Sequence, residues 1–146
     1  MENLNLKKPI FIFVDSSARK ELNQIGIGVV LCKEITELGL PVPDSILETI
    51  CEVHPGDRSS QGERLALLRG LFHALRLGYQ DIILFNDHEA VIKKLKERMA
   101  GVDQRISKEE EEFIRMSGKA QSLSIQRVAK RGNSLAHKLS RRGFKE

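Results

Sequence analysis

The sequence predicts a single α/β domain: a mixed five-stranded sheet, made of a three-stranded antiparallel meander and two parallel strands, flanked by helices. Two continuous apolar runs, at residues 10–14 and 81–85, are typical of strands buried on both faces of a sheet. Three candidate strands precede the first amphipathic helix, which favours an antiparallel meander at the start. Helices then alternate with the last two strands, and such crossovers require parallel pairing.

The N-terminal part of the chain predicts the meander. Polar residues 16–24 separate the first two strands and are expected to form a long turn. The second strand contains Gly26 and Gly28, which indicate a bulge or a close approach by another backbone segment. Residues 33–48 contain two prolines and predict an irregular loop. The three strands are expected at residues 10–14, 26–31 and 49–53.

Helices and strands alternate in the rest of the chain. Leucines at helical spacing predict a helix that ends at Gly78. Ser107 and Glu110 form a capping-box pattern that opens a later helix, and Asn133 is expected to cap the last one. The expected elements are helices at residues 63–77, 89–99 and 108–121, a final helix after Asn133, and strands at residues 81–85 and 123–128.

The composition fits one soluble domain. The chain has 146 residues, of which 40% are apolar and 30% charged, so a single core is expected at residues 10–142, with tails at 1–9 and 143–146. No apolar run approaches the roughly 20 residues of a membrane span, and the N-terminus lacks a secretory signal. We therefore expect a cytoplasmic protein with no membrane contact and no obligatory protein partner. Cys32 and Cys51 are too few for a disulfide framework or zinc site and are expected to be reduced and semi-buried.

Positive charge is concentrated near the C-terminus. The net charge of the chain is +4, but residues 117–146 contain eight cations and one anion, which gives +7 there and −3 elsewhere. This asymmetry predicts a basic face, which either contacts a polyanion or is a solvated helix face with a charged tail.

Three carboxylates are placed where an active site is expected. Asp15 and Asp87 each follow a predicted central strand, and the carboxyl ends of parallel strands form the usual site of an open α/β sheet. Glu63 opens the predicted crossover helix, where a single carboxylate often serves only the helix dipole. Three converging carboxylates repel one another unless a cation joins them, and hard oxygen ligands suit Mg²⁺ or Mn²⁺.

Four segments in order resemble the ribonuclease H family in its small single-domain form. They are a strand ending in Asp before a glycine-containing strand, a polar helix start leading to Glu, a second strand ending in Asp, and a C-terminal asparagine motif. The resemblance covers about residues 10 to 142. The matching segments read VDSS…GIGVVL, SSQGERLALLRGLFHAL, ILFNDHEAVIKKL and NSLAHKLSRR.

The resemblance implies a metal-dependent endonuclease that hydrolyses the RNA strand of RNA–DNA hybrids with two Mg²⁺ or Mn²⁺ ions. It makes Asp15, Glu63 and Asp87 catalytic, metal-binding carboxylates. Asp15 would bridge the ions, and Glu63 would lie on the leaving-group side near the 2′-hydroxyl that distinguishes RNA from DNA. The family's fourth acid falls on His137, a departure from the pattern. A neutral imidazole can still bind a metal, preferably Mn²⁺, or transfer a proton.

The resemblance also implies contacts to the nucleic acid. Ser59 and Ser60 replace asparagines that often contact the minor groove, while Ser16 and Ser17 stand where a Gly-Ser pair is usual. The basic handle helix of some members is not recognisable, because residues 103–112 are acidic. The nucleic-acid-binding residues are expected to be Ser16, Ser17, Ser59, Ser60, Asn133, Lys130, Arg131 and Arg141.

Other functions remain open at this point. A catalytically impaired member could bind hybrid or structured RNA, and His137 is the residue that separates it from an active enzyme. Another nuclease of the same fold, such as a junction resolvase or an integrase-like enzyme, is a further alternative, because fold does not determine function. An interaction module without nucleic acid is disfavoured by the three carboxylates.

Overall fold

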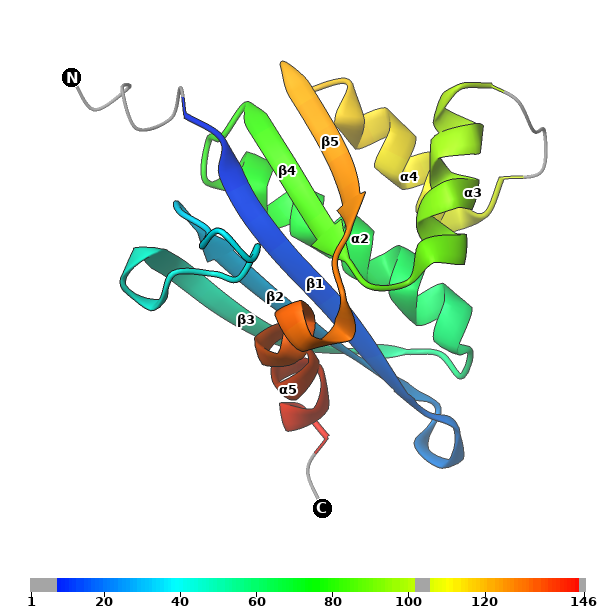
Figure 1. Cartoon of the computed structure of the whole chain (residues 1–146). Coiled ribbons are helices and arrows are strands. Elements are labelled where there is room, and N and C mark those ends of the chain that lie inside the picture. The colour runs from blue at the N-terminus through cyan, green and yellow to red at the C-terminus, as the bar shows by residue number, and fades with distance from the viewer. Residues whose placement is uncertain (1–7, 102–105, 145–146) are drawn as a thin grey trace.

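A computed structural model of the chain describes residues 8–101 and 106–144, which form a five-stranded sheet with helices on both faces (Figure 1). The strand order is β3-β2-β1-β4-β5. The first three strands pair antiparallel, while β4 is parallel to β1 and β5 to β4, so the predicted mixed sheet is confirmed. The expected tails lie largely outside the described residues. The strands are β1 (Ile10–Arg19), β2 (Gln24–Cys32), β3 (Ile46–Pro55), β4 (Asp81–Asn86) and β5 (Ser122–Arg127).

The β1–β2 hairpin is longer than expected. Pairing continues to Arg19 opposite Gln24, and only residues 20–23 form the turn, where Asn23 adopts the left-handed conformation with φ 53°. The long turn expected over residues 16–24 is therefore wrong. The polar side chains at this end of the hairpin give no apolar alternation, although their backbones still pair.

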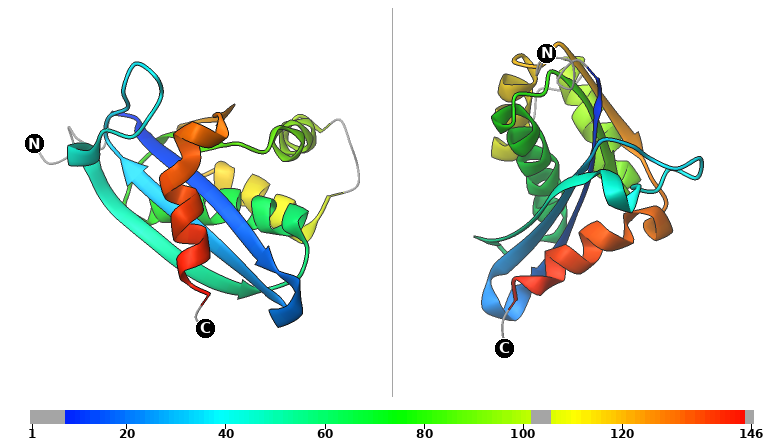
Figure 2. Two further views of the ribbon diagram at one scale, coloured as in Figure 1. Left: turned by 60° about the horizontal axis from the view of Figure 1, so that its bottom comes forward. Right: turned by 90° about the vertical axis from the view of Figure 1, so that its left-hand side faces the viewer.

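The helix at residues 134–142 covers one face of the sheet, and the helices between residues 59 and 117 cover the other, as Figure 2 shows. Two clusters of buried apolar residues lie on the two faces of the sheet, and successive β1 side chains point alternately into them. Ile12 and Val14 pack with α2 residues in the larger cluster, and Phe13 packs with α5 residues in the smaller one. No helix of the described residues is long and apolar enough to cross a membrane. The helices are α2 (Ser59–Arg76), α3 (Glu89–Met99), α4 (Lys108–Ser117) and α5 (Ser134–Arg142), with a 3-10 turn η3 (Lys130–Asn133) before α5.

The two glycines of β2 admit the backbone of α5. A Cβ on Gly26 would lie 1.9 Å from the Ser140 carbonyl oxygen, and one on Gly28 would lie 2.1 Å from the Ala136 carbonyl oxygen. No side chain fits at such distances, so the close backbone approach predicted for this strand is confirmed. It sets the position of α5 on the sheet.

Several predicted helix boundaries are wrong. Helix α2 begins at Ser59 rather than residue 63, because its polar first turn carries no apolar periodicity. Helix α4 ends at Ser117 rather than 121. Asn133 stands at the N-cap position of α5 as predicted, but it makes no capping hydrogen bond: its Nδ2 donates to the Val14 carbonyl, and its buried Oδ1 accepts no bond from the helix. Both cysteines are free as expected, but Cys51 is exposed on the edge strand.

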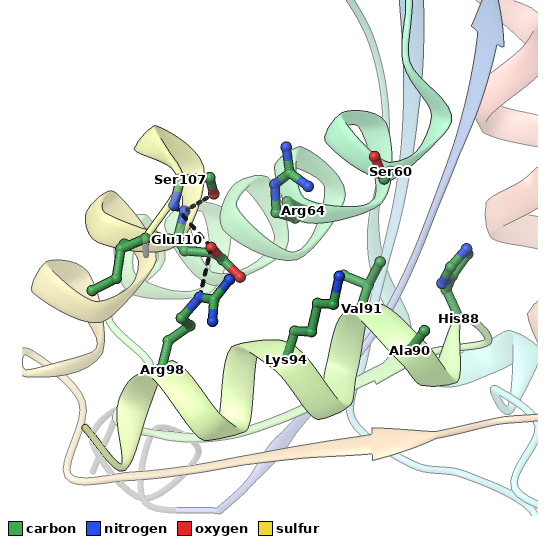
Figure 3. A pocket seen from close by; sticks show the side chains of 10 residues that line it. Ser60, Arg64, His88, Ala90, Val91, Lys94, Arg98, Ser107 and Glu110 are labelled. Atoms are coloured by element: carbon green, nitrogen blue, oxygen red, sulfur yellow. Dashed lines mark hydrogen bonds and ion pairs between the residues drawn. The ribbon is translucent and has the colours of Figure 1, made fainter. Parts of the chain in front are cut away.

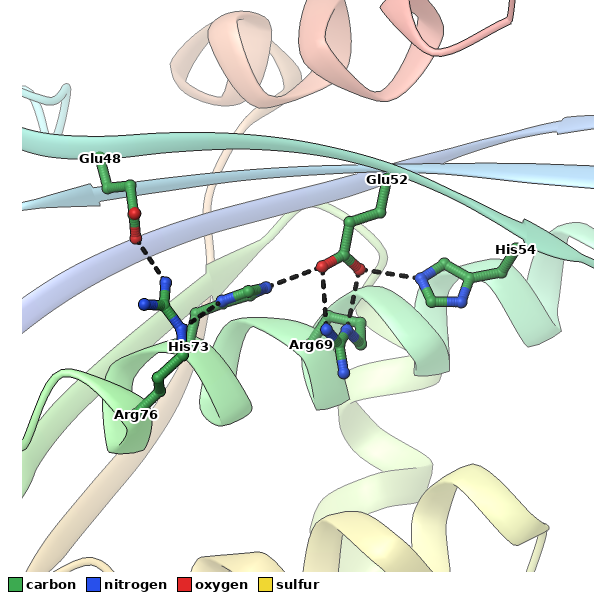
Figure 4. A network of polar contacts seen from close by, with 6 residues as sticks. All are labelled: Glu48, Glu52, His54, Arg69, His73 and Arg76. Atoms are coloured by element: carbon green, nitrogen blue, oxygen red, sulfur yellow. Dashed lines mark hydrogen bonds and ion pairs between the residues drawn. The ribbon is translucent and has the colours of Figure 1, made fainter.

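A charged network joins the edge strand β3 to α2 (Figure 4). Arg69 donates two hydrogen bonds to the Glu52 carboxylate, with N···O distances of 2.8 and 2.9 Å. The Nε2 atoms of His73 and His54 each lie 2.8 Å from the same carboxylate. Burial opposes ionisation of Glu52, yet these hydrogen bonds hold its pKa well below the usual range. His73 therefore has a structural partner far from the carboxylate cluster.

Candidate active site

The three predicted carboxylates meet at one edge of the sheet. Asp15 lies on β1, Asp87 follows β4, and the parallel register pairs Phe13 with Phe85, so the two aspartates are at matching positions. Glu63 reaches them from the second turn of α2, not from the first turn as expected. Each residue offers one carboxylate oxygen, and the three oxygens lie within 4.8 Å of one another. Three separate elements of the chain thus build one cluster.

The cluster holds more negative charge than its surroundings can compensate. Asp15 and Glu63 are 4% and 7% exposed. Burial, together with the charge of Asp15, raises the pKa of Glu63 to about 8. Burial and the charge of Asp87 also raise the pKa of Asp15. Because this donor set consists of hard oxygen ligands in mutual repulsion, it fits a divalent cation such as Mg²⁺ or Mn²⁺.

Asn86 organises the cluster from the interior. Its Nδ2 donates to Glu63 Oε1 and to the Val14 carbonyl, both at 3.0 Å, and its Oδ1 accepts a hydrogen bond of 2.8 Å from the His88 backbone. The side chain is fully buried. Asn86 therefore orients both the Glu63 carboxylate and the start of α3. This role was not predicted from the sequence, although an amide at the end of an apolar strand, just before Asp87, is a usable signal.

His137 lies beside the cluster, on the groove side of α5. Its Nδ1 is 3.0 Å from Asp15 Oδ2, while the Ser16 backbone N–H donates to Asp15 Oδ1 at 2.8 Å. The His137 side chain is 52% exposed and that of Asp15 is 6% exposed. The imidazole therefore contacts the buried aspartate with one nitrogen and leaves the rest of its ring open to a ligand.

A groove of about 370 Å³ opens over the cluster. Of the residues predicted to contact nucleic acid, it includes Ser16 and Lys130. Ser134 and His88 also line it and were not predicted as binding residues. The lining residues are Asp15, Ser16, Glu63, Asp87, His88, Lys130, Ser134 and His137.

Two predicted binding residues lie away from this groove. The Ser17 hydroxyl is 2.8 Å from that of Ser140 and ties β1 to α5. Asn133 is 1% exposed, and its Nδ2 donates to the Val14 carbonyl at 2.8 Å. Both side chains are thus engaged within the fold. The other predicted residues, Ser59, Arg131 and Arg141, are exposed at the surface.

A second groove, of about 730 Å³, lies between α2, α3 and α4 (Figure 3). It contains Ser60 and shares the lining residue His88 with the first groove, so the two grooves adjoin at this residue. Two of its cations are already paired. The Nε of Arg64 is 3.4 Å from a Glu109 oxygen, and Arg98 is 3.2 Å from Glu110.

Comparison with solved structures defines the class of protein. The chain is 19% identical to RNase H1 of Halobacterium salinarum, with a TM-score of 0.69 and coverage of 90% of this chain and 93% of the other. It is 18% identical to the N-terminal RNase H domain of a Mycobacterium tuberculosis protein, with a TM-score of 0.68 and 91% of each chain covered. LC11-RNase H1 from compost, solved with an RNA/DNA hybrid, is 21% identical, with a TM-score of 0.64 and coverage of 89% and 92%. The fold is therefore that of ribonuclease H.

A family model described as reverse transcriptase-like matches residues 13–143. The chain belongs to this family, as an RNase H-like member. No curated protein matches the chain by sequence. The family shown here agrees with the resemblance that the four sequence segments predict.

Proposed function

We propose that the chain is a metal-dependent endonuclease that hydrolyses the RNA strand of RNA–DNA hybrids. The observation that carries the proposal is the convergence of Asp15, Glu63 and Asp87, whose carboxylate oxygens lie within 4.8 Å. Membership of an RNase H-like family favours a nuclease, and a structural relative was solved with an RNA/DNA hybrid. The domain that performs this function would extend over residues 10–142.

The carboxylates of Asp15, Glu63 and Asp87 would hold two divalent ions. Bound ions would activate the attacking water and stabilise the departing 3′ oxygen. Asn86 holds Glu63 Oε1 by a hydrogen bond and so fixes the orientation of that carboxylate, and the Ser16 backbone N–H does the same for Asp15 through Oδ1. These hydrogen bonds organise the ligands before an ion binds, which lowers the cost of ordering them.

His137 would act as the fourth ligand or as a proton-transfer group. The distance of 3.0 Å between its Nδ1 and Asp15 Oδ2 supports either role. A nitrogen donor in place of a carboxylate favours Mn²⁺ over Mg²⁺ and leaves one negative charge less to attract the ion. We therefore propose that Mn²⁺ supports cleavage at least as well as Mg²⁺.

Contacts to the nucleic acid would come from both sides of the groove. Ser16 and Lys130 line it, and Ser59 and Ser60 stand at the exposed first turn of α2. Hydroxyl groups there can donate to and accept from the minor groove or a 2′-hydroxyl. Arg131 is one of the exposed cations on the opposite side and would contact phosphates without reading sequence.

A second candidate is a catalytically impaired protein that binds hybrids. The half-exposed His137, an imidazole at the position of the family's fourth acid, is the observation that favours it. Both candidates predict hybrid binding, but only the first predicts cleavage.

The test is cleavage of an end-labelled RNA–DNA hybrid in Mg²⁺ and in Mn²⁺, with Asp15→Asn as the control variant. We expect cleavage by the wild-type chain and none by Asp15→Asn, which should keep its circular dichroism spectrum. Binding without cleavage in either metal would support the impaired candidate. Cleavage by Asp15→Asn would show that the active site lies elsewhere.

A further inference from the structure

Exposed cations line the outer side of η3 and α5. No acidic residue occurs between Glu112 and Glu146, so this segment carries only positive charge. We call four of these exposed cations, Lys130, Arg131, Lys138 and Arg141, the basic crest. None of the ion pairs found within residues 8–101 and 106–144 involves a crest residue.

The crest starts at the catalytic groove and leads away from it. Lys130 lines the groove itself. Ser134, Lys138 and Arg141 follow at helical spacing on the exposed side of α5, opposite buried Ala136 and Leu139. From Ser134 to Arg141 the helix rises about 10 Å, which corresponds to about three nucleotides of one strand. Crest and groove therefore form one continuous surface.

Helix α5 presents these cations on a rigid support. Its backbone lies against Gly26 and Gly28, where no Cβ would fit. The Ser17–Ser140 hydroxyl contact of 2.8 Å adds a polar link between β1 and α5. In contrast, the cations Arg64 and Arg98 of the second groove are paired with glutamates. The crest thus offers fixed, uncompensated charge next to a cluster that repels phosphates.

We propose that the basic crest binds the sugar-phosphate backbone of the substrate duplex where it leaves the groove over α5, about three nucleotides beyond the cleaved bond. The proposal rests on the proposed function, which places the scissile phosphate at the carboxylates. Binding to the crest would not depend on the base sequence, because lysine and arginine side chains of this kind contact phosphates. It therefore extends the substrate footprint on one side only.

The test compares two variants that each lose two positive charges. Lys138→Gln/Arg141→Gln removes crest charge, and Lys93→Gln/Lys96→Gln removes exposed lysines from α3 as a matched control. The substrates are duplexes with one short ribonucleotide window that fixes the register, extended by about four base pairs on either side. Binding is measured by fluorescence anisotropy in Ca²⁺ over a range of salt concentrations, beside an all-DNA duplex of equal length.

We expect the wild-type chain to gain affinity from extension on one side only. The crest variant should lose that gain, bind the extended duplex about tenfold more weakly at low salt, and show a salt slope reduced by about two. The control variant should behave as the wild type. Equal losses in both variants, or no loss in either, would overturn the proposal.

Failure of the proposed function gives a different result. If the wild type cleaves hybrid but the crest variant binds normally, only the crest is excluded. If the wild type does not cleave, yet the crest variant binds the all-DNA and extended duplexes more weakly than the control, the crest stands and the nuclease proposal fails. Absence of any duplex binding by the wild type would overturn both.

Discussion

The buried Glu63 carboxyl makes the stability of the metal-free protein depend on pH. Its pKa is about 8 in the folded chain against an ordinary value of 4.5. Between these two pH values, Glu63 keeps its proton in the folded chain but has lost it in the unfolded chain. The associated stability is fully present below about pH 4.5 and is lost as pH rises through about 8. We expect Glu63→Gln, which keeps the shape and the bond from Asn86, to abolish most of this loss.

The magnitude follows from the difference between the two pKa values. A difference of about 3.5 pH units corresponds to at most about 5 kcal/mol of unfolding free energy. That is a large share of the stability of a typical domain, about 5–15 kcal/mol. A bound divalent ion would neutralise the carboxylates and, by mass action, restore the stability that is lost at high pH.

The assay is urea unfolding of the wild type and Glu63→Gln in EDTA between pH 5 and pH 9. We expect the two proteins to be closest in stability at pH 5 and the variant to be the more stable at pH 9. Addition of Mg²⁺ or Mn²⁺ at pH 9 should stabilise the wild type more than the variant. A stability difference that stays constant across this pH range would refute the reasoning about burial and repulsion.

Three further perturbations test other parts of the structure. Gly28→Ala should destabilise the protein by about 3 kcal/mol, roughly 10 °C in melting temperature, because its Cβ would meet the α5 backbone; Gly118→Ala, whose Cβ has its nearest neighbour at 3.6 Å, is the control. His137→Asp should shift metal preference in cleavage toward Mg²⁺, and an unchanged Mn²⁺ to Mg²⁺ ratio would exclude His137 as a ligand. Glu52→Gln should cost about 2 kcal/mol near neutral pH, measured by urea unfolding, because it weakens the bonds from Arg69, His54 and His73. Since the folded pKa of Glu52 is lowered, this cost should shrink as pH falls below about 4.5; a pH-independent cost would contradict it.

The strands and their terminal acids were predictable because their signals are local. Asp15 directly follows one apolar run, and Asp87 follows the other after Asn86. Parallel pairing of these two runs is enough to bring the two carboxylates close together. Glu63 was predictable as a partner because it opens the predicted crossover helix, and the resemblance gave it a metal-binding role. Its helix starts four residues earlier than its apolar pattern indicates, since the first turn is polar and exposed.

Contacts between distant segments could not be predicted in the same way. Asn86 and Glu63 are 23 residues apart, and no local pattern indicates that an amide will bond this carboxylate. Asn133 has the residue type and the position of a helix cap, but its side chain is oriented so that Nδ2 donates to a carbonyl on β1, 119 residues away in sequence, and Oδ1 accepts no bond from the helix. Local propensity lost to a tertiary partner in that case.

The position of α5 links the metal site to the proposed substrate path. His137 contacts Asp15 from the groove side of α5, and the basic crest lies on its exposed side. Both placements depend on the backbone approach that Gly26 and Gly28 permit. A Cβ at Gly28 would therefore displace His137 and the crest together and change stability, metal preference and duplex binding in one variant. Loss of Lys138 and Arg141 charge should change duplex binding alone, so comparing the two variants separates the docking of α5 from the charges that it carries.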